Sequence, residues 1–258
     1  MTTSAEVPTI QVTLNPVAVR SLAQLVAAES NEAVSFFLNS LVTADLSVSP
    51  EPPKGSMVYK LSAAFTADQR RDAFKSWIVA KGIQELIRGL RQTLEEAYFF
   101  SDALKQLPSR TTVAELDKLT ADIRRRANKL NYPQLITEVQ SRLTSAMTYE
   151  KEILSLVAVR NCLEHRHGIV GAADADANGQ LSLTLPRLQT VAIVEGKEIE
   201  IGPGYVSEAS TQIGIKRVNR ERTYRLGEKI EIDAAQFQEI AFACHLFAED
   251  IASKLPTS

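Results

Sequence analysis

Hydrophobic and polar positions follow two different periods along this chain. Up to about residue 170, apolar residues recur every three to four positions, which is typical of amphipathic helices. Asn15-Pro16 and Thr66 have the residue types of helix N-termini. A proline-rich loop is expected over 47–55. We expect helices over residues 16–45, 66–107, 113–130 and 134–146, and one more that begins near 148.

After residue 180 the hydrophobic period changes to two, which is typical of half-buried strands. Glu195-Gly196 is expected to form a hairpin turn, and Asp233 to cap a last helix with Gln236 completing a capping box. We expect strands over 181–185, 188–194, 197–201 and 213–218, and one or two more over 223–232. The pattern predicts a mainly α protein with a helical bundle over 1–170, a small antiparallel β segment over 171–232, and a C-terminal helix over 233–258. The last helix is expected to pack back on the bundle, in one continuous domain.

Two glycines, Gly82 and Gly89, lie seven residues apart on one face of the helix expected over 66–107. Glycine inside a helix costs about 1 kcal/mol relative to alanine. The pair therefore either weakens this helix locally or lets another helix approach it closely. The sequence leaves both interpretations open.

Composition limits the chemistry that the chain can carry. The formal net charge is −2, so RNA binding would depend on local patches rather than on global attraction. The two cysteines, Cys162 and Cys244, lie in helical patterns and show no zinc-like spacing, so we expect buried free thiols and neither a metal nor a cofactor. Residues 171–179 resemble the start of a calcium loop, but the glycine and the distant glutamate of that motif are not at the needed spacing. No membrane span or secretory signal is evident, so a cytoplasmic location is expected.

The segment from Leu154 to Val170 combines an apolar helix with a polar cluster at its end. Its first half is apolar on nearly every side, which favours a helix buried inside a bundle or an interface. Four polar residues then fall within about 140° of one another at about 100° per residue. They are Arg160, Asn161, Glu164 and His165. Gly168 is expected to end the helix at the C′ position, after Arg166 and His167. Buried charges cost several kcal/mol unless they are paired or bind a ligand, so this cluster is the first candidate site.

The six residues Arg160-Asn161-Cys162-Leu163-Glu164-His165 resemble the motif of the HEPN superfamily, in which an arginine and an adjacent polar residue precede a histidine by about four to six positions. His167-Gly168-Ile169-Val170 resembles what often follows the motif in bacterial members. The resemblance covers the helical part of the chain and not the strands. It implies a HEPN-like helical bundle that forms a homodimer through the motif helix.

Many active members of this superfamily are metal-independent endoribonucleases. The resemblance assigns phosphate binding to Arg160 and proton transfer to His165, with Asn161 orienting the imidazole or the phosphate. Glu164 would hold the Arg160 rotamer, and His167 would support the site. One motif supplies one such histidine, so two copies would supply an acid and a base. The expected product of RNA cleavage is a 2′,3′-cyclic phosphate.

The resemblance also implies a biological setting, namely a toxin–antitoxin or antiviral defence system with an antitoxin or defence-system partner protein. A second interpretation stays open: a non-catalytic HEPN-like dimeric interaction or regulatory module. The small net charge and the lack of a long basic tract favour it. A basic surface beside the motif would favour the nuclease.

The strand-rich segment is the most basic part of the chain. Its cations either bind RNA phosphates or keep sheet edges from pairing with other chains. They are Lys216, Arg217, Arg220, Arg222 and Arg225.

Overall fold

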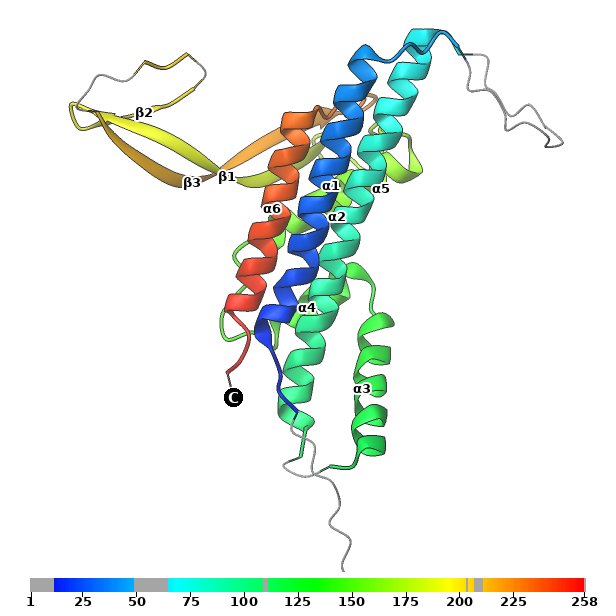
Figure 1. Ribbon diagram of the computed structural model, residues 1–258, viewed down its shortest axis with the longest axis vertical. Coiled ribbons are helices and arrows are strands. Elements are labelled where there is room, and N and C mark those ends of the chain that lie inside the picture. Colours follow the sequence, from blue (N-terminus) through cyan, green and yellow to red (C-terminus); the bar gives the residue numbers. More distant parts are fainter. Residues whose placement is uncertain (1–11, 49–64, 109–110, 203, 207–210, 258) are drawn as a thin grey trace, which may run out of the picture.

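The computed structural model describes residues 12–48, 65–108, 111–202, 204–206 and 211–257 of the chain. The described part is mainly α, with a small antiparallel sheet before the last helix, as the hydrophobic pattern predicts. Long helices lie side by side in a bundle, and the sheet projects from its side (Figure 1). The elements are α1 (Pro16–Thr43), α2 (Ala67–Gln106), α3 (Val113–Asn128), α4 (Tyr132–Gln140), α5 (Glu150–His165), β1 (Gln180–Val194), β2 (Lys197–Glu200), β3 (Gln212–Arg225) and α6 (Ala234–Ser253).

The predicted caps fix where three helices begin. The Asn15 side chain accepts from the Val17 amide, with Pro16 as the first residue of α1. Capping boxes begin α2 at Thr66 and α6 at Asp233. In each box the side chain of the cap and that of the third helical residue satisfy amides that the helix leaves unpaired.

The helix predicted over 134–146 is shorter and begins earlier: α4 runs from Tyr132 to Gln140. The chain after it forms other hydrogen bonds, because the Gln140 side chain accepts from the Met147 amide at 2.8 Å. The Thr144 amide donates to the Lys254 carbonyl, at the end of α6, at 2.9 Å. These contacts replace the helical hydrogen bonds that a longer α4 would need.

Among the described residues, the sheet has three antiparallel strands in the order β2-β1-β3. The strands β1 and β3 are long, and β2 is short. The prediction of separate strands over 181–185 and 188–194 is wrong, because β1 continues through Pro186. Among the described residues, β3 is the only strand paired with β1 at Pro186, because β2 pairs with β1 only over Val191–Val194. A proline is tolerated there because the other side of β1 has no neighbour that needs an amide donor.

Two further details of the sheet bear on the predictions. Glu195 and Gly196 both have positive φ, 51° and 75°, as a two-residue type I′ hairpin turn requires, so the predicted turn is confirmed. The strand predicted over 223–232 ends at Arg225 as part of β3. Residues 226–229 then turn, and Ile230 and Ile232 are buried outside the sheet.

One hydrophobic cluster joins the bundle, the base of the sheet and the last helix. Its members from α2, α5, β1 and α6 include Ile83, Leu156, Leu183, Phe237 and Phe247, all fully buried. The described helices and the sheet therefore share one core.

The two glycines of α2 lie where other helices approach it. A Cβ atom on Gly82 would lie 2.5 Å from Val34 Cγ2 of α1 and 2.6 Å from Phe237 Cζ of α6. A Cβ atom on Gly89 would lie 3.0 Å from Val26 Cβ of α1. Of the two interpretations that the sequence left open, close helix approach is the one the structure supports.

We predict that Gly82→Ala destabilises the protein although alanine is the better helix former. The added methyl overpacks a core that has no room for it, which costs about 1–3 kcal/mol. Thermal unfolding followed by circular dichroism measures the change. Gly202→Ala is the matched control, because a Cβ atom there would meet nothing within 4 Å. A Gly82→Ala variant as stable as the control would contradict the close approach.

Candidate functional site

The candidate site begins with the two sides of α5. One side packs against α2 and β1 and is buried. Its members are Ile153, Leu156, Val159, Cys162 and Leu163. The opposite side carries Leu154, Val157 and Ala158, which are only partly buried. The bundle therefore buries one side of this half of α5, and the half-buried apolar strip on the other side leads to the polar cluster. Of the two predicted settings, a bundle and an interface, the bundle covers one side of the helix only.

Three of the four clustered residues contact one another. Arg160 Nη2 lies 2.5 Å from Glu164 Oε2, one helical turn further along. Arg160 Nη1 donates to Asn161 Oδ1 at 3.1 Å. The Arg160 side chain is 27% exposed, and its Nε is buried without a hydrogen-bond partner among the described residues. The guanidinium is thus held in one rotamer with one unsatisfied donor.

His165 completes the cluster on the exposed side of α5. Within the described ranges its ring has neither a hydrogen bond nor an ion pair. Asn161 lies one turn before it, but the Asn161 side-chain oxygen accepts from Arg160. The imidazole is therefore accessible to solvent and to a ligand.

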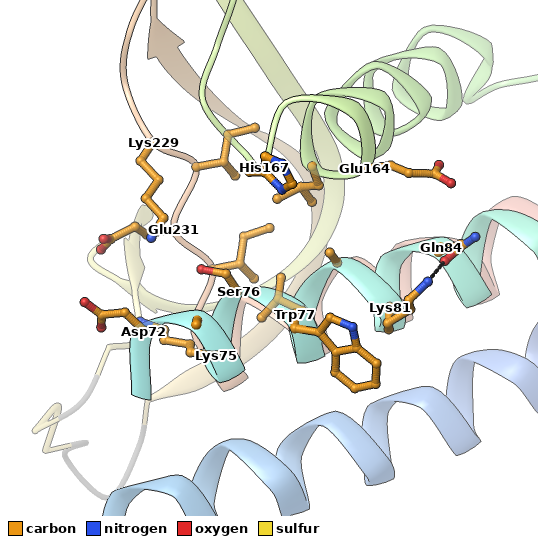
Figure 2. Close-up of a pocket in the computed structure, with 16 residues that line it drawn as sticks. Asp72, Lys75, Ser76, Trp77, Lys81, Gln84, Glu164, His167, Lys229 and Glu231 are labelled. Carbon is orange, nitrogen blue, oxygen red and sulfur yellow. Dashed lines mark hydrogen bonds between the residues drawn. The ribbon is translucent and has the colours of Figure 1, made fainter. Parts of the chain in front are cut away.

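The helix ends one residue earlier than the glycine signal predicted. Arg166 is the C-cap, and His167 rather than Gly168 is the first residue with positive φ, at 54°. Gly168 follows with φ of 79°. Positive φ is uncommon for a residue with a side chain, although histidine tolerates it better than most. The reversal turns His167 out of the helix toward α2 (Figure 2).

Backbone and side-chain contacts clamp the chain that leaves α5. The Ile230 amide donates to the Gly168 carbonyl at 2.8 Å, and the Val170 amide to the Glu228 carbonyl at 2.9 Å. Arg166 also forms an ion pair with Asp174, whose Oδ2 accepts from the Gly171 amide at 2.9 Å. The contacts hold residues 228–230 beside the end of α5.

Asp174 and Asp176 are engaged by hydrogen bonds within the loop that follows α5. Burial raises the pKa of Asp174, but hydrogen bonds from Arg166 and from the Gly171 amide outweigh this and keep it below its ordinary value. Asp176 accepts from the amides of Asn178 and Gln180. No group of three or more histidine, cysteine or acidic side chains that would hold a metal ion occurs among the described residues.

A pocket of about 550 Å³ lies between α2, the end of α5 and residues 229–232. Glu164 and His167 border it on the α5 side, and Lys229 borders it on the 229–232 side (Figure 2). On α2 it is bordered by Trp77 and Lys81, among others. Trp77 follows the apolar period of its helix, but it is 64% exposed. Sequence reasoning missed these α2 residues, because no local pattern indicates that α2 lies beside the motif.

The basic residues of the strands do not gather at the motif. Lys216 pairs with Glu198, and Arg217 donates to the hydroxyl of Tyr149. Tyr149 lies just before α5, and Arg160 comes eleven residues later, about 16 Å along the helix axis. The contact with Tyr149 therefore holds Arg217 away from the motif.

The other three cations of this set lie further along β3. Arg220 and Arg222 both pair with Glu239 of α6. Arg225, at the end of β3, is exposed and has no side-chain partner among the described residues. Four of the five cations are therefore engaged within the chain, and an RNA-binding role for the set stays a prediction.

The two cysteine thiols are poor candidates for nucleophilic catalysis. Cys162 and Cys244 are buried, free thiols, as the sequence predicts. Burial raises the pKa of the Cys162 thiol to about 11 and that of Cys244 further. Neither is a thiolate near neutral pH, and the thiolate is the reactive form.

No family model, curated protein or solved structure matches this chain. The likeness to the HEPN superfamily therefore stays with the motif residues and their setting. Among the described residues, no helix is both long and apolar enough to cross a membrane.

We predict that Asp174→Asn lowers stability at neutral pH and flattens its dependence on acid. The pKa of Asp174 is depressed in the folded state, so its contribution is present above the ordinary value of 3.8 and is lost as the pH falls below it. A hydrogen bond to a charged group, such as the one that the Gly171 amide donates to Asp174, is worth about 1.5–3 kcal/mol. Urea unfolding between about pH 7 and about pH 2 measures the difference from wild type. Asp117→Asn, at an exposed position of α3, is the control; equal pH profiles for the two variants would contradict the role of Asp174.

Proposed function

We propose that this protein is a metal-independent endoribonuclease of the HEPN type that acts as a homodimer. One observation carries the proposal: at the exposed end of α5, a guanidinium held by Asn161 and Glu164 shares a side with the unengaged imidazole of His165. A fixed cation that binds phosphate and a side chain that carries protons are two kinds of group that RNA cleavage without a metal requires.

The chemistry assigns a step to each group. The 2′-oxygen of the RNA attacks the adjacent phosphorus, so the O2′–P bond forms while the P–O5′ bond breaks. A base takes the proton of the 2′-hydroxyl, and an acid gives a proton to the leaving 5′-oxygen. Arg160 binds the non-bridging phosphate oxygens, because its forked donors match them. The products are a 2′,3′-cyclic phosphate and a 5′-hydroxyl.

Two copies of the chain would complete this machinery. Each chain contributes one His165, whereas the reaction needs both a base and an acid. The outward strip of Leu154, Val157 and Ala158 leads directly to the motif on α5. A two-fold contact along this strip would cover apolar surface and bring the two motifs together, since such an interface uses the same patch of both copies.

A second function is favoured by a specific observation. The Arg160 guanidinium is already paired with Glu164, and most basic residues of β3 are engaged in the chain. A non-catalytic dimeric interaction or regulatory module would use the same residues to stabilise its interface. For the nuclease, the proposed setting is a cytoplasmic toxin–antitoxin or antiviral defence system with an antitoxin or other partner protein.

We predict that purified wild-type protein cuts total RNA in the presence of EDTA. We expect the His165→Ala variant to cut it at least about 100-fold more slowly. Arg160→Ala loses a similar factor, because developing charge on the phosphate is no longer bound. Gel analysis with mapping of the product ends measures both the rate and the cyclic phosphate.

Matched controls separate the site from general damage. His245→Ala removes another exposed histidine, and Arg125→Ala removes an exposed arginine of α3. Both are expected to cut RNA like wild type. Cleavage by all variants alike would refute the assignment, and no cleavage by folded wild type would favour the module.

We also predict that Val157→Glu converts a dimer into a monomer, because it places a charge in the outward strip of α5. Light scattering after size-exclusion chromatography measures the mass. Val113→Glu, at an exposed position of α3, is expected to leave the dimer intact. A monomeric wild type, or a dimeric and folded Val157→Glu variant, would contradict the proposed interface.

A further inference from the structure

The pocket beside the motif has an apolar floor and a charged rim. The floor includes Val79 and Ala80 of α2, Leu163 of α5 and Ile230. A pocket of about 550 Å³ falls within the range of small-molecule sites, roughly 300–1,000 Å³. It is therefore large enough to enclose a group with an apolar or aromatic face.

Cations at the rim are available to a ligand. Lys75 and Lys229 form neither ion pairs nor side-chain hydrogen bonds with any part of the chain that the structure describes. Lys81 donates only to the neutral Gln84 side chain, at 2.8 Å. Lysine ammonium groups left without a carboxylate partner are suited to bind phosphate.

Carboxylates at the same rim are equally available. Asp72 and Glu231 have no partner within the described ranges, whereas Glu164 is paired with Arg160. A lining with both signs of charge does not favour phosphate on its own, which the carboxylates would repel. It favours a ligand that carries phosphate together with neutral hydrogen-bond donors, such as sugar hydroxyls and base amino groups, because carboxylate oxygens accept hydrogen bonds from them.

Trp77 adds an aromatic surface at the α2 edge of this pocket, where its indole points toward α1 and lies near Lys81 (Figure 2). Most of its side chain is exposed, although the indole ring is the largest apolar side chain that a protein has. Exposed aromatic rings beside cations are typical of surfaces on which unpaired bases stack.

We propose that the pocket binds one nucleotide unit of a single-stranded RNA, with its base on Trp77, its phosphate at the lysines and its hydroxyl or amino groups at the carboxylates. Glu164 belongs both to the pocket rim and to the ion pair with Arg160, so the pocket adjoins the motif. A nucleotide held here would place a neighbouring phosphate of the same strand at Arg160. This orientation rests on the proposed nuclease function, whereas nucleotide binding itself does not.

Trp77 makes the inference directly measurable, because it is the chain's one tryptophan. The His165→Ala variant is titrated with adenosine monophosphate, with a five-nucleotide single-stranded RNA and with inorganic phosphate, while tryptophan emission is recorded. We expect saturable quenching with the mononucleotide and the RNA, and none with phosphate at equal concentration. No saturable change with either nucleotide ligand would overturn the proposal.

Lysine variants locate the binding. Lys229→Ala and Lys75→Ala are each expected to weaken binding of the five-nucleotide RNA about tenfold or more, whereas Lys118→Ala on the exposed side of α3 leaves it unchanged. Equal affinities for the three variants would overturn the pocket assignment. Two variants at different points of the rim guard against the failure of one to fold.

The same titration separates this inference from the nuclease proposal. Saturable, lysine-dependent quenching by a protein that cuts no RNA refutes the nuclease and leaves the nucleotide pocket standing. Cleavage that depends on Arg160 and His165 while Lys229→Ala and Lys75→Ala bind RNA like wild type refutes the pocket alone.

Discussion

The candidate site depends on the clamp between the end of α5 and the chain that leaves β3. More than fifty residues separate Gly168 from Ile230, yet the amide of Ile230 donates to the carbonyl of Gly168. This contact and the ion pair of Arg166 with Asp174 fix where α5 ends. They also bring Lys229 to one wall of a pocket whose other wall is α2. Without the clamp, the polar cluster of α5 would be a solvated helix end with no pocket beside it.

Packing of the bundle provides the rigid side of this arrangement. Gly82 lets α1 and α6 approach α2 more closely than any residue with a side chain would permit. The buried side of α5 packs on the same helix, so α2 connects the core to the pocket wall. Charged residues are tolerated at the end of α5 because Arg160 has Glu164 as a partner and the cluster lies at the surface. The cost of desolvating a lone charge does not arise there.

Local signals in the sequence predicted local structure well. The helix cap at Thr66, the capping box at Asp233 and the hairpin turn at Glu195 are as the residues indicate, because each depends on a few neighbouring positions. Pro186 misled the prediction of separate strands, since its tolerance depends on which strand lies beside β1. Where α4 ends was also missed, because contacts with α6 decide it.

In the candidate site, too, the sequence predicts the residues that local spacing groups and misses those that tertiary contacts bring in. One helix brings Arg160, Asn161, Glu164 and His165 to a shared side, so helical spacing alone was enough to group them. Trp77 and Lys229 come to the pocket through tertiary contacts that no spacing encodes. The sequence places the basic residues of β3 in one set. In the structure they bind separate partners on α6, on β2 and before α5, so they do not act as one free basic patch.

In the proposed reaction, the 2′-hydroxyl of the RNA attacks the neighbouring phosphate without a metal. This can be tested with one oligoribonucleotide that wild type cuts and with the same sequence carrying a 2′-deoxy sugar at the cut position, both in EDTA. We expect the ribose substrate to be cut to a 2′,3′-cyclic phosphate and a 5′-hydroxyl, and the deoxy substrate to stay intact at that position. Equal cutting of both substrates, or products with a 3′-hydroxyl and a 5′-phosphate, would refute this mechanism.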